Sequence, residues 1–246
     1  MQKLYIIAGC NGAGKTTSIR ILMNVFPATA GNVLIDGRPI DYSKIKFGYL
    51  PEERGLYPKK KILEQLCYFA ELHGMSHSDA IRAVDYWLDR LGMTEFRTKR
   101  LDTLSKGNQQ KIQLVTALAH DPDIVILDEP FSGLDPVNAM LLKDVVKEQI
   151  SKGKIVLFSS HQMSYIEEFC DSIAILNAGK VAVCGDLHDI KRNYPRDRLV
   201  VRTEKPEPIM AELGDACSLT EKGELLIKLT SAGEKRAMMA RIASKY

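Results

Sequence analysis

A phosphate-binding loop pattern near the start of the chain constrains its fold most strongly. Residues 9–16 read Gly-Cys-Asn-Gly-Ala-Gly-Lys-Thr, which satisfies G-x-x-x-x-G-K-[ST], and the apolar run 4–8 precedes them. The pattern predicts a strand that enters a glycine-rich turn and continues into a helix from residue 16 to about residue 25. Because Gly12 and Gly14 lack a Cβ, the backbone can aim several N–H groups at one phosphate, and the helix start adds positive charge. We therefore expect an α/β protein of the P-loop NTPase class with a mostly parallel core sheet.

Two side chains of this loop carry the expected chemistry. Lys15 should reach the outer phosphates of a nucleotide, and Thr16 should offer its hydroxyl to Mg²⁺. The alternative, a glycine-rich turn that binds nothing, is disfavoured because the strand, the spacing, the lysine and the threonine all agree. The predicted nucleotide-binding residues are Gly9, Cys10, Asn11, Gly12, Ala13, Gly14, Lys15, Thr16 and Thr17.

A pair of acids follows a second apolar run. Residues 124–127 are apolar and lead directly into Asp128 and Glu129, which predicts a buried parallel strand with two carboxylates at its C-terminal edge. That edge is where doubly wound sheets bind ligands. Because neighbouring strand residues face opposite sides, the two acids are expected to differ in role: Asp128 in the magnesium shell and Glu129 polarising the attacking water. Without the phosphate loop, two surface acids at a strand end would be the better interpretation.

Ser105 indicates a second anion site. It is a strong N-cap residue, and residues 107–119 have the apolar spacing of a helix. A hydroxyl, free N–H groups and the helix dipole would then face one point in front of the helix. One small chain rarely needs two such sites, unless the second serves a neighbour's nucleotide. An ordinary capped helix remains the alternative for Ser105 taken by itself.

Taken in order, these motifs resemble the nucleotide-binding domain of ATP-binding cassette (ABC) transporters, of the exporter type. The phosphate loop matches residues 9–16, the signature matches 104–109, the acids match Asp128 and Glu129, a following loop matches 132–135, and a switch histidine matches His161. The resemblance covers residues 7–186 and implies ATP and Mg²⁺ as cofactors and ATP hydrolysis as the activity. Its implied catalytic residues are Glu129, His161 and Lys15, with Ser105, Gly107 and Asn108 reaching the nucleotide from the signature.

The resemblance also implies partners. Two nucleotide-binding subunits, expected to be identical, would face each other head to tail, each clamping ATP between its own phosphate loop and the other's signature. The membrane-spanning permease would be a separate chain, which places this subunit in the cytoplasm at the inner face of the cell membrane. Residues 56–58 and the helices near them are the candidate docking surface for that permease.

Several positions depart from the family pattern. Glu52 stands where the family usually has glutamine, so the metal is expected to meet a charged oxygen there; Lys106 replaces glycine and Asn108 replaces glutamine in the signature. The chain also looks short at both ends relative to the family, and it has no match for the aromatic residue that stacks on adenine ahead of the loop. Losing one such stack costs about 1–3 kcal/mol of binding.

Composition narrows the remaining classes. The net charge of +3 gives no argument for a nucleic-acid partner, and five scattered cysteines without a C-x-x-C motif suggest neither a disulfide framework nor a zinc site. No apolar stretch is long enough to span a bilayer, and no signal peptide is visible. Outside the switch position, the histidines are interpreted as solvated: His73, His77, His120 and His188.

The remaining segments suggest a layout. A hairpin is expected at Asp36-Gly37, and amphipathic helices over 62–73 and 78–91 belong to a helical subdomain of about 55–118. We expect an ATPase domain over 1–190 and a small α/β accessory segment over 191–246. That segment should contain strands near 198–203 and 224–229, helices at 208–213 and 231–244, and a linker marked by Pro206 and Pro208.

The leading functional hypothesis is the ATPase subunit of a transporter. Two alternatives stay open at this point. One is a non-transport ABC ATPase of translation or DNA repair, although such proteins usually carry two cassettes or a long coiled-coil insertion. The other is a truncated chain that binds nucleotide with little turnover.

Overall fold

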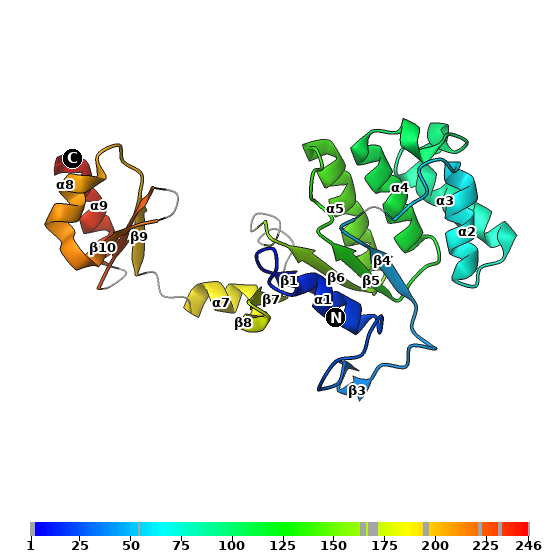
Figure 1. Cartoon of the computed structure of the whole chain (residues 1–246), viewed down its shortest axis with the longest axis horizontal. Coiled ribbons are helices and arrows are strands. Elements are labelled where there is room, and N and C mark those ends of the chain that lie inside the picture. The colour runs from blue at the N-terminus through cyan, green and yellow to red at the C-terminus, as the bar shows by residue number, and fades with distance from the viewer. Residues whose placement is uncertain are drawn as a thin grey trace. The chain divides into compact units, whose positions relative to one another are not determined.

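The computed structural model describes residues 3–53, 55–162, 166, 172–193, 197–220, 223–230 and 233–245 (Figure 1). The chain divides into two compact units, Met1–His188 and Asp189–Tyr246. Each unit has its own buried core and is described separately below.

A six-stranded sheet forms the centre of the first unit, in the order β4-β5-β6-β1-β7-β8. All neighbouring strands pair in parallel except β7 and β8, which are antiparallel. The strands are β1 (Lys3–Ala8), β4 (Phe47–Leu50), β5 (Ile124–Asp128), β6 (Ile155–Ser160), β7 (Ser172–Asn177) and β8 (Lys180–Asp186). The mostly parallel α/β fold predicted from the sequence is confirmed.

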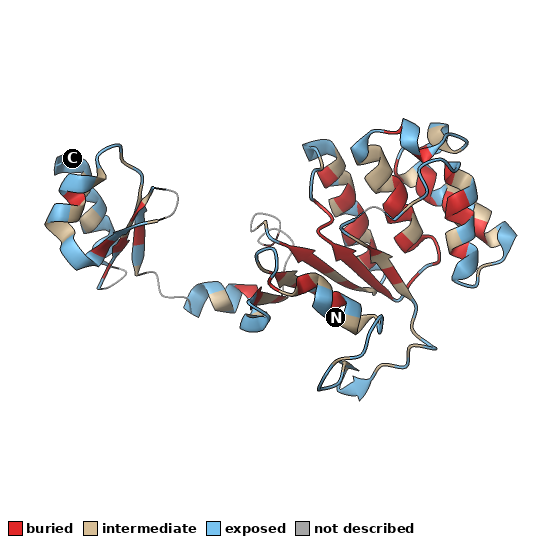
Figure 2. Ribbon diagram, in the orientation of Figure 1, coloured by how far each residue is buried: buried red, intermediate tan, exposed pale blue. Residues whose placement is uncertain are grey.

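Helices cover both faces of this sheet. On one face, Ile19 of α1 (Lys15–Leu22) packs against Ile124 and Ile126 of β5. On the other face, Phe158 of β6 lies edge-on to Phe131, near the start of α5 (Pro136–Ser151). Figure 2 shows buried residues along the central strands and on the helices that pack against them. Because side chains two residues apart on one strand share a face, the face of each strand residue determines which polar groups can meet at the sheet edge.

Helix α1 is shorter than the expected span to residue 25. It ends at Leu22, and Asn24 takes a left-handed backbone conformation with φ of 58°. Asparagine tolerates this region better than most residues, so the helix stops there. The short hairpin predicted at Asp36-Gly37 is present, with β2 (Leu34–Ile35) pairing antiparallel to β3 (Arg38–Pro39).

A group of helices lies between β4 and β5 in the sequence. It consists of α2 (Ile62–Leu72), α3 (His77–Arg90), the 3₁₀ turns η1 (Thr94–Phe96) and η2 (Leu101–Thr103), and α4 (Lys106–Leu118). The buried sides of α2 and α3 are mainly apolar at helical spacing, as the predicted amphipathic pattern requires: Ile62, Leu66 and Ala70 in α2, beside buried Gln65, and Ala80, Val84 and Leu88 in α3.

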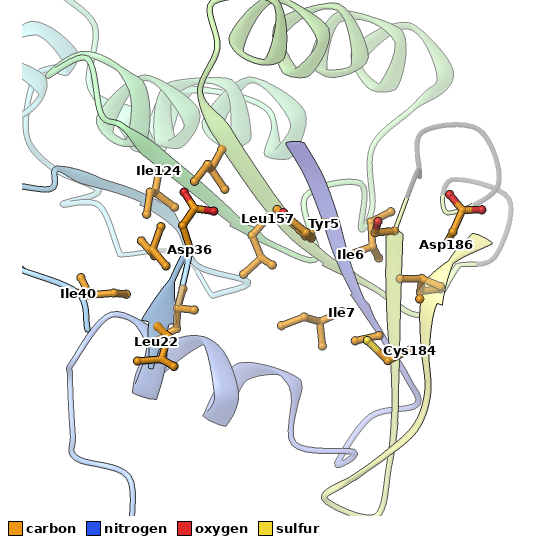
Figure 3. A pocket seen from close by; sticks show the side chains of 17 residues that line it. Tyr5, Ile6, Ile7, Leu22, Asp36, Ile40, Ile124, Leu157, Cys184 and Asp186 are labelled. Carbon is orange, nitrogen blue, oxygen red and sulfur yellow. The ribbon is translucent and has the colours of Figure 1, made fainter. Parts of the chain in front are cut away.

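On the α1 face of the sheet lies a hollow of about 500 Å³. Figure 3 shows Leu22, Ile7 and Leu157 among its lining, with Cys184 and Asp186 at the β8 side. The lining is mainly aliphatic and includes none of the predicted site residues. This hollow is therefore separate from the phosphate loop chemistry.

The second unit begins within α7 (Leu187–Asn193) and contains a three-stranded antiparallel sheet in the order β10-β11-β9. Its elements are β9 (Arg198–Val201), α8 (Pro206–Leu213), the turn η3 (Gly214–Ala216), β10 (Cys217–Leu219), β11 (Leu225–Lys228) and α9 (Glu234–Lys245). The expected linker at Pro206 and Pro208 is wrong, because both prolines lie in the first turn of α8. Proline is tolerated there, since the N–H that it lacks would have no helical partner.

Within the described residues, none of the helices combines the length and the apolar character needed to cross a membrane.

Candidate functional site

The phosphate loop connects β1 to α1 in an unusual backbone conformation. Gly12 and Gly14 have φ of 81° and 99°, in the left-handed region that favours glycine. At Gly9 an added Cβ would lie 2.5 Å from the Leu176 carbonyl oxygen, so only glycine fits that close approach. Helix α1 has no side-chain N-cap, which leaves its first N–H groups available to an anion.

Lys15 turns back from the start of α1 into a buried position. Its ammonium donates a hydrogen bond to the Gly9 carbonyl oxygen at 2.6 Å and lies 2.9 Å from Oε1 of Glu129. The side chains of Lys15 and Glu129 are only 7% and 3% exposed, so water screens this ion pair little. The lysine expected to hold phosphate is here neutralised by the carboxylate expected to act on water.

Glu129 is held on its other side by the switch histidine. His161 Nδ1 lies 2.9 Å from Glu129 Oε2. Burial alone would raise the pKa of Glu129, but hydrogen bonds and charge from Lys15 and His161 outweigh burial and keep that pKa below its ordinary value. Lys15, Glu129 and His161 thus form one connected cluster, although they are far apart in the sequence.

Asp128 lies beside this cluster and faces α1. The Thr16 hydroxyl donates to Asp128 Oδ2 at 2.9 Å, and the Ser159 hydroxyl donates to Oδ1 at 2.5 Å. Both oxygens of the buried Asp128 carboxylate therefore have partners, as burial of a charge requires. Burial, followed by the charge of Asp128, raises the pKa of the nearby Tyr49 to about 12.

The residues that would meet magnesium fit such an ion in part. Thr16 and Asp128 present hard oxygen ligands to one point, which suits Mg²⁺, and Mg²⁺ usually takes one or two carboxylates and completes its shell with phosphate and water. Among the described residues no group of three or more His, Cys, Asp or Glu side chains forms a metal cage. Glu52 is exposed, and no hydrogen bond or ion pair joins it to Thr16 or Asp128 within the described part of the chain.

The signature residues lie at the start of α4. Ser105 caps α4 as predicted, its Oγ accepting from the Asn108 N–H at 3.3 Å, and it is exposed. An added Cβ on Gly107 would come within 3.0 Å of the Asn138 side chain, so the starts of α4 and α5 adjoin. In the described chain Ser105 makes no hydrogen bond to residues 9–16, so the structure does not bring the two predicted anion sites together within one copy.

Three polar residues near the site were missed by sequence reasoning. Ser159 lies opposite Asp128 in the β5–β6 register, and Tyr49 lies on the same sheet face. Gln113 of α4 is buried and donates to the carbonyl oxygens of Pro51 and Glu53, at 3.4 and 3.0 Å, which ties the Glu52 loop to the signature helix. Gln113 stands among other polar residues of α4, Gln109, Gln110 and Thr116, so its sequence gives no signal of this buried contact.

The interpretation of His120 as a solvated residue is wrong. It is 2% exposed, its Nε2 lies 3.0 Å from the Phe47 carbonyl oxygen, and its ring stacks on His73 with centroids 3.8 Å apart. Burial lowers the pKa of His120 to about 4, and the charge of His73 adds to this. The residue follows the end of α4 and turns inward to β4, a tertiary contact that its sequence neighbours do not reveal.

Comparisons with known proteins identify relatives of this chain. Residues 1–132 match a family model described as ABC transporter. The chain is 46% identical over 204 residues to the uncharacterized ABC transporter ATP-binding protein YhaQ of Bacillus subtilis, covering 82% of this chain and 68% of that protein. It is 48% identical over 198 residues to an uncharacterized ABC transporter ATP-binding protein of Alkalihalophilus pseudofirmus, covering 80% and 74%. A solved structure described as the ATP binding subunit of an ABC transporter superposes with a TM-score of 0.70 at 32% identity, covering 78% of this chain and 81% of that one.

Proposed function

We propose that this chain, which belongs to the ABC transporter family as an ATP-binding and ATP-hydrolysing subunit, closes around ATP as a head-to-tail dimer and thereby powers a separate membrane-spanning subunit. The observation that carries the proposal is the cluster in which Lys15, Glu129 and His161 meet, next to the pair of Thr16 and Asp128. In this proposal the cluster supplies a phosphate ligand, a base and oxygen ligands at one edge of a mostly parallel sheet.

The cluster also suggests how binding prepares hydrolysis. When the outer phosphates of ATP enter the loop, they compete with Glu129 for the ammonium of Lys15. Lys15 then turns to the phosphates, and the released carboxylate is free to orient a water molecule and accept its proton. His161, which lies 2.9 Å from Glu129, would keep that carboxylate in position and contact the terminal phosphate.

Magnesium would be held by Thr16 and Asp128 in this proposal. When bound, the ion would neutralise charge on the outer phosphates. Asp128 and Thr16 are held 2.9 Å apart before any ligand binds, so their oxygens need little rearrangement.

The exposed start of α4 supports the proposed dimer. Ser105 presents a capped helix start to solvent and has no anion partner among the described residues of its own copy, so we assign it to the triphosphate bound by a second copy. The adjoining start of α5, capped by Asp135, would lie in the same interface. Two identical copies related by a two-fold axis would then complete two equivalent sites.

An aromatic surface supports a permease contact at the cytoplasmic face of the membrane. Tyr57, Tyr68 and Leu72 are 50–64% exposed, and both tyrosine rings contact Phe69. Buried Gln65 accepts a hydrogen bond from the Tyr57 N–H at 3.1 Å, which fixes the loop that carries this ring. Large apolar side chains grouped on a surface commonly mark a protein interface.

The permease contact is tested by co-purification from membranes. Replacing Tyr57 and Tyr68 by serine should reduce recovery of a multi-span partner while ATP binding persists. Val181→Ser removes an equally exposed apolar residue from β8 and should leave recovery unchanged. Recovery of the partner at the wild-type level after serine replaces Tyr57 and Tyr68, as after Val181→Ser, would contradict this docking surface.

The second unit carries none of the site residues, and we assign residues 191–246 an accessory role in regulation or dimer support.

The proposed activity is tested by phosphate release from Mg²⁺-ATP. Lys15→Ala should abolish nucleotide binding and turnover, because the ammonium that meets the phosphates is lost. Lys147→Ala removes an exposed lysine of α5 and serves as the matched control. Absence of phosphate release by the wild-type chain, with and without its membrane partner, would overturn the proposal.

A further inference from the structure

One serine hydroxyl connects the two acids of the site. Ser159 Oγ donates to Asp128 Oδ1 at 2.5 Å and accepts the backbone N–H of Glu129 at 2.9 Å. Ser159 has no exposed surface, so no water competes for either bond. The fold dictates this meeting, because the register of β5 and β6 sets Ser159 directly opposite Asp128.

A hydroxyl is suited to this double contact. It carries one hydrogen and two lone pairs, whereas a backbone N–H only donates and an ionised carboxylate only accepts. The amide of Glu129 therefore bonds to the serine oxygen, and the serine hydrogen goes to Asp128. Alanine could make neither bond, and the thiol of cysteine would make both poorly.

The backbone at Glu129 explains why this support is needed. Glu129 has φ of 49°, a left-handed conformation that a side chain larger than glycine adopts with strain. This turn directs its carboxylate to Lys15 and His161, while the side chain of Asp128 faces Thr16. The bond from the Glu129 N–H to Ser159 fixes the turn at the residue where the two acids diverge.

We propose that Ser159 is a positioning residue of the ATPase site, holding Asp128 in its orientation toward Thr16 and fixing the backbone turn that aims Glu129. The inference rests on the proposed ATPase function and deepens it. Ser159 touches neither nucleotide nor water in this account and acts through the two acids.

Neighbouring Ser160 provides a matched control. It is almost as buried as Ser159, but its Oγ accepts from the Gln162 N–H at 3.0 Å, and no bond joins it to either acid in the described chain. Ser160→Ala removes the same atom from the next position of the same strand. It should leave kcat unchanged.

The kinetic test compares Ser159→Ala, Ser159→Cys and Ser159→Thr with the wild type. Alanine and cysteine should lower kcat by about 10- to 100-fold, the effect of losing hydrogen bonds to charged groups. They should also raise the Mg²⁺ concentration needed for half-maximal rate, while KM for ATP changes little because the phosphate loop is intact. Threonine keeps the hydroxyl and should recover much of the rate.

A second readout does not depend on turnover. In the nucleotide-free chain, the Glu129 amide should lose hydrogen-exchange protection in Ser159→Ala, and Ser160→Ala should keep the protection at this amide. This measurement also separates positioning from misfolding, because a misfolded variant would lose protection throughout β5 and β6.

Two results have different meanings. If the wild type hydrolyses ATP and Ser159→Ala keeps wild-type kcat, Mg²⁺ dependence and Glu129 amide protection, the assignment of Ser159 is overturned. If the wild type hydrolyses no ATP, the proposed function fails instead, whatever the exchange data show for the serine.

Discussion

Replacing Glu129 by glutamine should destabilise the nucleotide-free chain and strengthen its binding of ATP. The substitution keeps the shape of the side chain but removes the charge that lies 2.9 Å from the Lys15 ammonium. It also replaces the acceptor that faces His161 Nδ1. The loss of stability and the gain in ATP affinity should have similar size, because both arise from the contact between Lys15 and Glu129.

The expected magnitude follows from the geometry. Lys15 keeps its bond to the Gly9 carbonyl oxygen, so its charge is not left without any partner. Removing one partner of a fully buried pair costs about 3–5 kcal/mol, and a hydrogen bond to a charged group contributes about 1.5–3 kcal/mol. With the Gly9 contact retained, we expect a loss of about 2 kcal/mol, nearer the second range. For a unit of this size that lowers Tm by about 4–8 °C.

The same free energy appears in ATP binding with the opposite sign. In the wild type, phosphates must separate Lys15 from Glu129, whereas in Glu129→Gln that contact is already weakened. About 2 kcal/mol corresponds to about 30-fold tighter binding. Turnover should be lost in the same variant, because the proposed base is gone.

Calorimetric titration with ATP in EDTA measures the affinity without hydrolysis, and thermal unfolding without nucleotide measures the stability. Glu95→Gln, at an exposed position of η1, serves as the charge-matched control. A Glu129→Gln variant with wild-type Tm and wild-type Kd for ATP would refute the competition between Glu129 and phosphate for Lys15.

Three further predictions concern a close backbone contact, a buried histidine and the second unit. Gly48→Ala should destabilise the first unit by about 3 kcal/mol or more in urea unfolding, because an added Cβ would lie 2.0 Å from the Ala117 carbonyl oxygen. The control Gly55→Ala, at a position with open space around it, should leave the stability nearly unchanged. His120 has a folded pKa of about 4, below its unfolded value of about 6.5, so its protonation favours the unfolded chain and stability falls as pH drops from 6.5 toward 4. His120→Gln should remove about 2 kcal/mol of the stability difference between pH 7.5 and pH 5, and an unchanged difference would contradict the assignment. Deleting residues 189–246 should leave phosphate release in place, and its complete loss would show that the second unit belongs to the catalytic machinery.

Local chemistry explains which features could be predicted from the sequence. The strand, turn and helix around Lys15 follow from contiguous residues, as does the N-cap at Ser105, whose partner Asn108 is three residues away. The strand before Asp128 could also be predicted, because four consecutive apolar residues end in an acid. In each case the deciding interactions lie within one element.

The features that could not be predicted depend on which strands become neighbours. Ser159 and Asp128 meet because β6 pairs with β5 in one register, and nothing in either segment states that order. The sequence predicts a surface position for His120 after a helix, whereas in the fold its ring is buried against the Phe47 carbonyl oxygen. The ion pair of Lys15 and Glu129 likewise needed the folded sheet edge.

The central claim is that two copies share each ATP. The most direct test is a structure of Glu129→Gln with Mg²⁺-ATP, in which the Ser105 hydroxyl of one copy should lie within hydrogen-bonding distance of the terminal phosphate held by Lys15 of the other. ATP bound at the phosphate loop with Ser105 facing solvent in both copies would contradict the claim.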